Sequence, residues 1–240
     1  MAKKKKPMSK RRKVVLIVVG VLILFFAIQG PLTWASQTGK FAAGNKAAYS
    51  VENTEALSDS ALKGKTIIFL GSSVVYGSTS QGQSFVEYLE KRDGIIPVKE
   101  AVSGTTLVDE TVWGKKSYIE RMKTIDPTIH ADAFVCQLST NDATMKKPLG
   151  SVSDSFDKND FDTKTIAGAI EYVIAYAKET WNCPVIFFTG TQYKSEAYGK
   201  MVELLQAIAA KWDIGLLDLW NDPDMNAVSV YSARVEHLGR

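Results

Sequence analysis

A chain of 240 residues, 45% of them hydrophobic, is long enough for one sizeable globular domain. Its formal net charge of +3 comes from the amino terminus, where eight of the first thirteen residues are Lys or Arg; without them, 21 basic residues stand against 26 acidic ones, a net charge of −5. A mildly acidic body argues against a nucleic-acid-binding surface, so no nucleic-acid partner is expected.

An apolar run follows the basic segment directly. It covers residues 14–28 and continues weakly to Trp34. The whole run is about 20 residues long, which is the length that crosses roughly 30 Å of hydrocarbon. We predict a basic cytoplasmic tail over residues 1–13 and one transmembrane signal-anchor helix over 14–34. Because a basic flank stays in the cytoplasm, the body of the chain is expected to be extracellular.

The end of the apolar run leaves a second interpretation open. Thr33-Trp34-Ala35 resembles a small-x-small cleavage site, so the run is alternatively a cleaved signal peptide that still exports the body. Residues 35–64 are polar, small and weakly periodic. They predict a stalk or linker, with one short helix near Thr54 to Leu62, that leads into a domain over residues 65–240.

Five short apolar runs in that domain predict strands, at residues 66–70, 96–102, 133–138, 184–188 and 214–219. Segments of helical periodicity separate them, at residues 83–92, at 118–125, from a cap at Asp162 or Thr163 through Ala177, and from Met201 to Trp212. Strands that alternate with helices indicate right-handed crossovers and a parallel sheet. The predicted fold is a three-layer α/β/α sandwich with a five-stranded parallel sheet of flavodoxin type.

Features outside these elements give further expectations. The polar loop at residues 146–160 is too long for a plain connection and is expected to shape the mouth of a substrate site. Cys136 and Cys183 are expected to be inert buried thiols rather than a disulfide. The sequence has no Cys-x-x-Cys pair and no His-rich cluster, so no metal site is expected.

Hydroxyl and amide groups follow the predicted strands. Ser72-Ser73 follows the first strand, Ser103-Gly104 the second and Asn141-Asp142 the third. Because parallel strands share one carboxyl edge, these groups fall on the same rim of the sheet. A hydroxyl nucleophile, a glycine amide and an asparagine amide are the parts of an acyl-transfer site. The alternative is a plain turn in which the serines only cap the following helix.

A serine nucleophile needs a base, and the chain has two histidines. His130 precedes the third predicted strand, which places it at the amino edge, on the wrong side of the sheet. His237 follows the last strand and can fold back over the carboxyl rim. Elimination therefore pairs His237 with Ser73 or Ser72; the alternative is that His237 is a tail residue without a role.

Four short blocks resemble the signatures of the SGNH, or GDSL-type, hydrolase superfamily. They are Phe69 to Val74, Ala101 to Gly104, Gln137 to Asp142 and the segment around His237. The resemblance implies an ester hydrolase without a cofactor, in which Ser73 is the nucleophile and His237 the base. It also implies an oxyanion hole formed by the amides of Ser73 and Gly104 and the side chain of Asn141. A basic head, one anchor and a short stalk are similar to surface-tethered members from Gram-positive bacteria.

The chain departs from this family pattern at several positions. Ser72 replaces the usual Asp and Ser139 the usual Gly, and neither is a triad member. Arg234 stands where the family has the Asp that supports the histidine, and the tail from residue 228 is expected to be altered or truncated. In a triad protease the loss of that Asp lowers turnover about 10⁴-fold. Three carboxylates are candidates to replace it: Asp218, Asp222 and Asp224.

Two hypotheses follow from these features. The first is an extracytoplasmic serine esterase that removes small acyl groups, O-acetyl above all, from cell-envelope carbohydrate, or that hydrolyses lipid esters. Its expected partners are an acylated glycan or lipid substrate and the membrane. The second is a catalytically impaired surface module that binds carbohydrate or serves as a scaffold, and Arg234 supports it.

Overall fold

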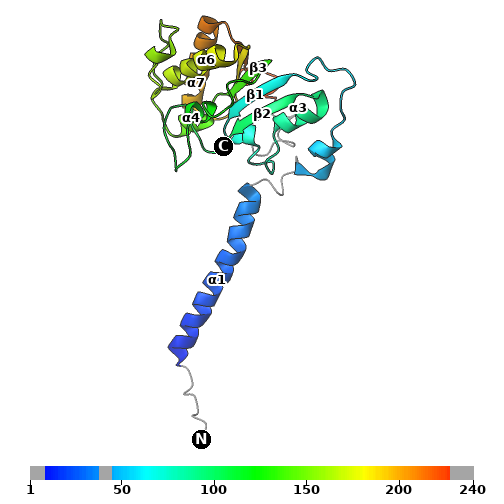
Figure 1. Ribbon diagram of the computed structural model, residues 1–240. Helices are drawn as coiled ribbons and strands as arrows, with labels where there is room; N and C mark the ends of the chain where they lie inside the picture. The colour runs from blue at the N-terminus through cyan, green and yellow to red at the C-terminus, as the bar shows by residue number, and fades with distance from the viewer. Residues whose placement is uncertain (1–8, 38–44, 228–240) are drawn as a thin grey trace.

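The structure is a computed structural model that describes residues 9–37 and 45–227. Its centre is a parallel sheet of five strands in the order β2-β1-β3-β4-β5 (Figure 1). The strands are β1 (Thr66–Gly71), β2 (Ile96–Ala101), β3 (Ala133–Gln137), β4 (Val185–Phe188) and β5 (Gly215–Leu217). This strand order is the flavodoxin-like one, and the predicted fold class is confirmed.

Helices cover both faces of the sheet. The longer ones are α3 (Phe85–Asp93), α6 (Ile166–Trp181) and α7 (Glu196–Trp212). The shorter ones are α2 (Ser73–Tyr76), α4 (Tyr118–Met122) and α5 (Thr140–Thr144), together with the 3-10 turns η2 (Ala47–Tyr49), η3 (Val51–Asn53) and η4 (Lys158–Asp160). Figure 1 shows α6 and α7 on the side of the sheet away from α3.

The sequence of β1 explains why this strand lies at the centre of the core. Successive side chains of a strand point to opposite faces, and β1 is apolar on both. Ile68 and Leu70 pack into the larger cluster, with residues of α4, α6 and α7. Ile67 and Phe69 pack into the smaller cluster, with residues of α2 and α3.

The strand register brings the carboxyl ends of the first three strands together. Gly71, the last residue of β1, pairs with Ala101, the last residue of β2. Leu70 pairs with Cys136, which is one residue before the end of β3. The segments that follow β1, β2 and β3 therefore leave the sheet side by side, at the rim where the sequence places its candidate site.

Two local predictions about helices are wrong. Residues 54–62 form no helix; the 3-10 turns η2 and η3 precede them, and the Asn53 side-chain amide closes this segment by donating to the Ala47 carbonyl at 2.6 Å. The α6 helix is capped by Thr165, whose hydroxyl accepts from the Gly168 amide, and not by Asp162 or Thr163. The Asp162 carbonyl already accepts the Thr165 amide at 3.0 Å, so a separate turn precedes the helix.

Of the predicted stalk, residues 35–37 belong to the end of the amino-terminal helix α1 (Lys10–Gln37), and residues 45–64 lie against the α/β domain. The Tyr88 hydroxyl of α3 donates to the Tyr49 carbonyl at 2.5 Å. The Leu57 amide donates to the Arg92 carbonyl at 2.7 Å, near the end of the same helix. Backbone and side-chain hydrogen bonds therefore hold this stretch on the surface beside α3.

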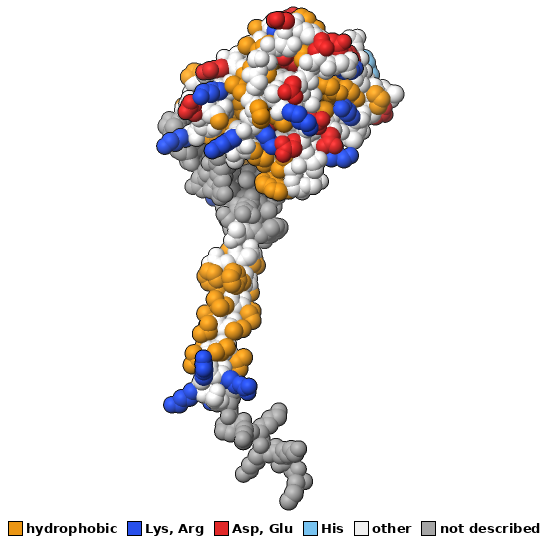
Figure 2. Space-filling view, turned by 90° about the vertical axis from the view of Figure 1, so that its left-hand side faces the viewer, with side chains coloured by type: hydrophobic (Ala, Val, Ile, Leu, Met, Phe, Trp, Pro, Cys, Tyr) orange, Lys and Arg blue, Asp and Glu red, His pale blue; other side chains and the backbone are white. Residues whose placement is uncertain are grey.

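The amino-terminal helix α1 (Lys10–Gln37) stands apart from the α/β domain (Figure 1). Within Lys10–Thr33 a window of 18 residues has a mean hydropathy of 2.6, and among the described residues this is the one helix that is long and apolar enough to cross a membrane. Figure 2 shows apolar side chains along the helix and basic side chains gathered at its first residues, Lys10 to Lys13.

The two cysteines, Cys136 and Cys183, are free and buried, as predicted.

Candidate active site

The two serines after β1 differ in their access to solvent. Ser72 is fully buried, and its amide donates to Oε1 of Gln137, the last residue of β3, at 3.0 Å. Ser73 is the first residue of α2 and is half-buried. Among the described residues the Ser73 hydroxyl has no hydrogen-bond partner, so it is the free hydroxyl of this turn.

Two glycines allow the turn to be this tight. A Cβ atom on Gly71 would lie 2.2 Å from Cγ2 of Val75. Gly77 ends α2 with φ +80°, and a Cβ atom there would lie 2.2 Å from the Gln83 carbonyl oxygen. Gly71 is needed for the close approach, and Gly77 for both the close approach and the left-handed conformation. These two residues hold Ser73 at the start of the helix.

The loops after β2 and β3 contact each other beside this turn. Gly104 has φ +84° and is half-buried. Nδ2 of Asn141, the second residue of α5, donates to the carbonyl of Thr105 at 2.7 Å. One of the two amide protons of Asn141 is therefore used inside the protein, and the other remains for a ligand. The structure thus brings Asn141 to the residue that follows Gly104.

Asp142 locks the same two loops together. Its carboxylate is fully buried and accepts the Leu107 amide at 2.9 Å and the Val108 amide at 3.0 Å. Burial raises the pKa of the Asp142 carboxyl, and the two backbone amides oppose that shift by stabilising the charged form. Asp142 therefore positions α5, which carries Asn141, against the segment that follows Gly104.

Arg121 of α4 joins the ends of β1 and β2, and its side chain is only 6% exposed. Its Nη2 donates to the Gly71 carbonyl at 2.9 Å and to the Thr105 hydroxyl at 3.0 Å. Its Nη1 donates to the backbone carbonyl and to the carboxylate of Glu100, at 3.2 and 3.0 Å. A single guanidinium thus fixes the last residue before the serine turn and the residue after Gly104.

The positioning roles of Arg121, Asp142 and Gln137 were not predicted from the sequence. Arg121 alone carries a usable signal, because it lies in a short segment whose neighbours Ile119 and Met122 are apolar. A cation in such a segment has to be paired when it is buried. The partners themselves lie far away in the chain, and nothing local in the sequence identifies them.

The base predicted for this site is not placed by the structure. His237 and Arg234 lie outside the described residues. His130 is exposed and precedes β3, at the amino edge where the sequence places it. Asp218 follows β5 and accepts hydrogen bonds from the side chains of Gln206 and Asn221, both at 2.8 Å. Partial burial opposes these bonds, but together they lower the pKa of the Asp218 carboxyl.

The middle of the loop at residues 146–160, which is expected to shape the mouth of a substrate site, is held by Lys211. Nζ of Lys211 donates to the carbonyls of Ser153 and Ser155, at 2.6 and 2.5 Å. Lys211 lies in the last turn of α7, just before β5 begins at Gly215. This part of the loop is therefore held near the amino edge of the sheet, away from Ser73.

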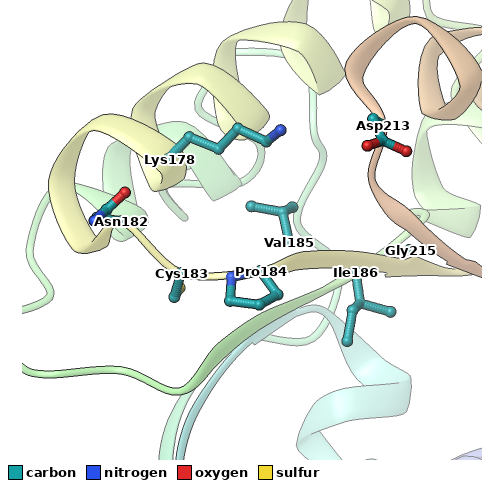
Figure 3. Close-up of a pocket in the computed structure, with 8 residues that line it drawn as sticks. All are labelled: Lys178, Asn182, Cys183, Pro184, Val185, Ile186, Asp213 and Gly215. Carbon is teal, nitrogen blue, oxygen red and sulfur yellow. The ribbon is translucent and has the colours of Figure 1, made fainter.

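A cavity of about 390 Å³ also lies at the amino edge (Figure 3). Its lining comes from the end of α6, the start of β4 and the start of β5, and includes Lys178, Asn182, Cys183, Val185, Asp213 and Gly215. Parallel strands begin at this edge, so the cavity is on the opposite side of the sheet from Ser73, Gly104 and Asn141.

Comparisons with known proteins agree with the fold. No protein-family model matches the chain, and the comparison with curated proteins gives no match. Among solved structures, the chain is similar to a protein from Bacteroides ovatus described as a GDSL-like lipase, with 19% identity, a TM-score of 0.53, and coverage of 72% of this chain and 97% of that chain.

Two further solved structures are similar. A protein from Chitinophaga pinensis described as a possible lipase has 15% identity and a TM-score of 0.53, over 67% of this chain and 69% of that chain. A family two carbohydrate esterase from Clostridium thermocellum has 13% identity and a TM-score of 0.47, over 72% of this chain and 62% of that chain. At these identities the two matches with a TM-score of 0.53 show a likeness of fold: the chain has the α/β fold of the proteins described as lipases.

Proposed function

We propose that this chain is a serine ester hydrolase of the SGNH, or GDSL-type, superfamily, anchored by α1 and acting outside the cytoplasm. The observation that carries the proposal is Ser73, whose half-buried hydroxyl, at the carboxyl end of the central strand, has no hydrogen-bond partner among the described residues. Gly104 and Asn141, which supply amide donors, lie on the same rim. The fold shared with GDSL-like lipases supports the same chemistry.

The proposed reaction begins with attack of the Ser73 Oγ on the acyl carbonyl, while His237 takes the hydroxyl proton. The Ser73 and Gly104 amides and Nδ2 of Asn141 stabilise the negative charge that develops on the carbonyl oxygen. His237 then gives the proton to the leaving alkoxide, and the acyl group stays on Ser73. Water attacks the acyl-enzyme by the same route, which releases the acid and restores Ser73.

The proposed substrate is a small acyl ester, O-acetyl above all, on cell-envelope carbohydrate; a lipid ester is the second choice. The location of the domain supports this choice. The basic residues at the start of α1 favour a cytoplasmic amino terminus, which puts the domain on the face where envelope polymers lie. The surface-bound residues 45–64 follow the anchor in the chain and lead into that domain.

Labelling with a fluorophosphonate tests this proposal directly. A nucleophilic serine displaces fluoride from the probe and forms an Oγ–P bond, whereas unactivated serines do not react. We expect the full-length protein in detergent to be labelled on the peptide that contains Ser73, as read by mass spectrometry. A label on Ser72, or on any other residue, would contradict the assignment, and a protein that stays unlabelled would favour the second candidate.

The second candidate function is a surface module that binds carbohydrate or acts as a scaffold without turnover. Arg234 favours it, because the family pattern has an Asp at that position. If Arg234 is what limits the turnover of an otherwise intact enzyme, Arg234→Asp should raise kcat for a short-chain ester at least about tenfold. The expected gain is large because the loss of the Asp from a catalytic triad lowers kcat by far more than tenfold. Arg234→Gln, which removes the charge but adds no carboxylate, is the control and should gain less. Equal rates in all three proteins would show that position 234 does not limit turnover.

A further inference from the structure

A small hairpin at residues 112–115 holds an unusual turn. Val112 and Lys115 pair as an antiparallel bridge, with N–H···O distances of 3.0 and 2.9 Å. The two residues between them, Trp113 and Gly114, have φ +50° and φ +74°. Two successive left-handed residues are typical of a type I′ turn, in which Asn-Gly is the favoured pair. A bulky Trp at the first position is sterically disfavoured.

The side chain of Trp113 does not offset this strain by packing. It is 78% exposed, the largest exposed fraction among the large hydrophobic side chains that the structure describes. Burial in the core would stabilise the fold, but an indole held in water contributes little to it. A strained backbone that presents an exposed aromatic ring points to a role in binding.

The hairpin is fixed beside the candidate oxyanion hole. A Cβ atom on Gly104 would lie 3.6 Å from Cζ3 and 3.9 Å from Cε3 of Trp113, so the indole lies on the side of this glycine where a side chain would project. Nζ of Lys115 donates to the Ser103 carbonyl at 2.7 Å, which ties the hairpin to the loop that carries Gly104. Val112 is buried and anchors the base of the hairpin. The ring is therefore held at a set position on the rim.

We propose that Trp113 is a substrate-binding residue, a platform on which a sugar ring of the alcohol half of the ester stacks. This inference rests on the proposed function, because it uses Gly104 as the point where the acyl carbonyl binds. With the carbonyl at Gly104, the group attached to the ester lies within reach of the indole. One face of a pyranose ring is rich in C–H groups, which pack on the electron-rich face of an indole while the hydroxyls stay in water.

The surroundings of Trp113 favour a sugar over a lipid chain. A site for an acyl chain is typically an enclosed, mostly apolar pocket. Trp113 is instead a ring that is 78% exposed. A single exposed ring gives a flat polar ligand a place to stack but leaves an alkyl chain in water.

The test is the affinity of the full-length protein, in detergent, for two oligosaccharides: a β-1,4-linked hexamer of N-acetylglucosamine, and cellohexaose. Calorimetry on the parent should detect binding of at least one of them. Asn is favoured at the first position of a type I′ turn, so the Trp113→Asn variant should fold at least as well as the parent. The variant loses the stacking contact with the sugar, so its Kd should rise about tenfold. Trp113→Phe should recover part of the affinity.

Ile96→Thr is the matched control. Ile96 is 55% exposed at the start of β2, on the amino edge, so its removal takes away apolar surface far from the rim and should leave Kd unchanged. A parent that binds neither hexamer, or a Trp113→Asn variant that binds like the parent, would overturn the inference. The inference would also be overturned if Trp113→Asn raised KM for a lysophospholipid but left KM unchanged for an O-acetylated form of the hexamer that binds. Binding needs no turnover, whereas labelling of Ser73 tests the esterase proposal alone, so the two can fail separately.

Discussion

Replacing Ser73 by Ala is expected to lower kcat for a short-chain aryl acetate by at least about 10³-fold, because loss of the nucleophile in a serine hydrolase leaves only the residual effect of binding and the oxyanion hole. The fold should be unaffected. The Ser73 side chain is half-buried, and its hydroxyl has no hydrogen-bond partner among the described residues. The melting temperatures of the variant and the parent should therefore agree within a few degrees, roughly the range of a substitution without structural contacts.

Ser72→Ala is the matched comparison for Ser73→Ala. The Ser72 hydroxyl is fully buried and lies 3.5 Å from Oε1 of Gln137, at the limit of a hydrogen bond, so it cannot attack a substrate without leaving the core. Its removal should change kcat less than about tenfold, because the Ser72 amide still bonds to Gln137. The reverse pattern, with Ser72→Ala inactive and Ser73→Ala active, would assign the nucleophile to Ser72. A parent as slow as Ser73→Ala would favour the binding module.

The sheet could be predicted from the sequence because its strands are short apolar runs that end in small or polar residues. In β1, residues 67–71 are all buried, so one run of the sequence already carries the information on burial. The same alignment of strand ends predicted that Ser73, Gly104 and Asn141 would share a rim. These predictions need only local patterns and the general rule that parallel strands have a common carboxyl edge.

The misses come from contacts between residues far apart in the chain. Residues 54–62 form no helix, and their contacts are with the domain: the Leu57 amide donates to the Arg92 carbonyl and the Ser60 hydroxyl to the Asp93 carboxylate. The middle of the loop at residues 146–160 is held near the amino edge because Nζ of Lys211, more than fifty residues later, donates to the carbonyls of Ser153 and Ser155. No periodicity or turn signal in these segments encodes such partners.

Arg121→Met is expected to destabilise the protein by about 3 kcal/mol, because it leaves buried acceptors without their donor. The guanidinium is the common partner of the Gly71 carbonyl, the Thr105 hydroxyl and Glu100. For a chain of this size, a loss of about 3 kcal/mol corresponds to a fall in Tm of roughly 6–12 °C. Near-ultraviolet circular dichroism of the full-length protein in detergent measures this change.

The same substitution should also reduce activity, below the temperature at which the variant unfolds. Arg121 fixes the residue two before Ser73 and the residue after Gly104, so its loss loosens the nucleophile and the oxyanion donor together. Misplacement of such groups by about 1 Å costs on the order of 10²-fold in rate, and the loss should appear in kcat more than in KM. Arg121→Lys keeps the charge without the planar fork and should recover only part of both stability and rate.

Arg92→Met provides the control for removing an arginine. The Arg92 side chain is 56% exposed on α3, and its one ion pair with a described residue is with Asp93, at 4.0 Å, so its loss should change stability by less than about 0.5 kcal/mol. If Arg121→Met melts with the parent and keeps its kcat, the buried arginine does not position the serine turn. If it melts early but keeps kcat at low temperature, Arg121 supports the fold alone. Only a joint loss of Tm and kcat, partly recovered in Arg121→Lys, fits a residue that joins the two loops of the active site.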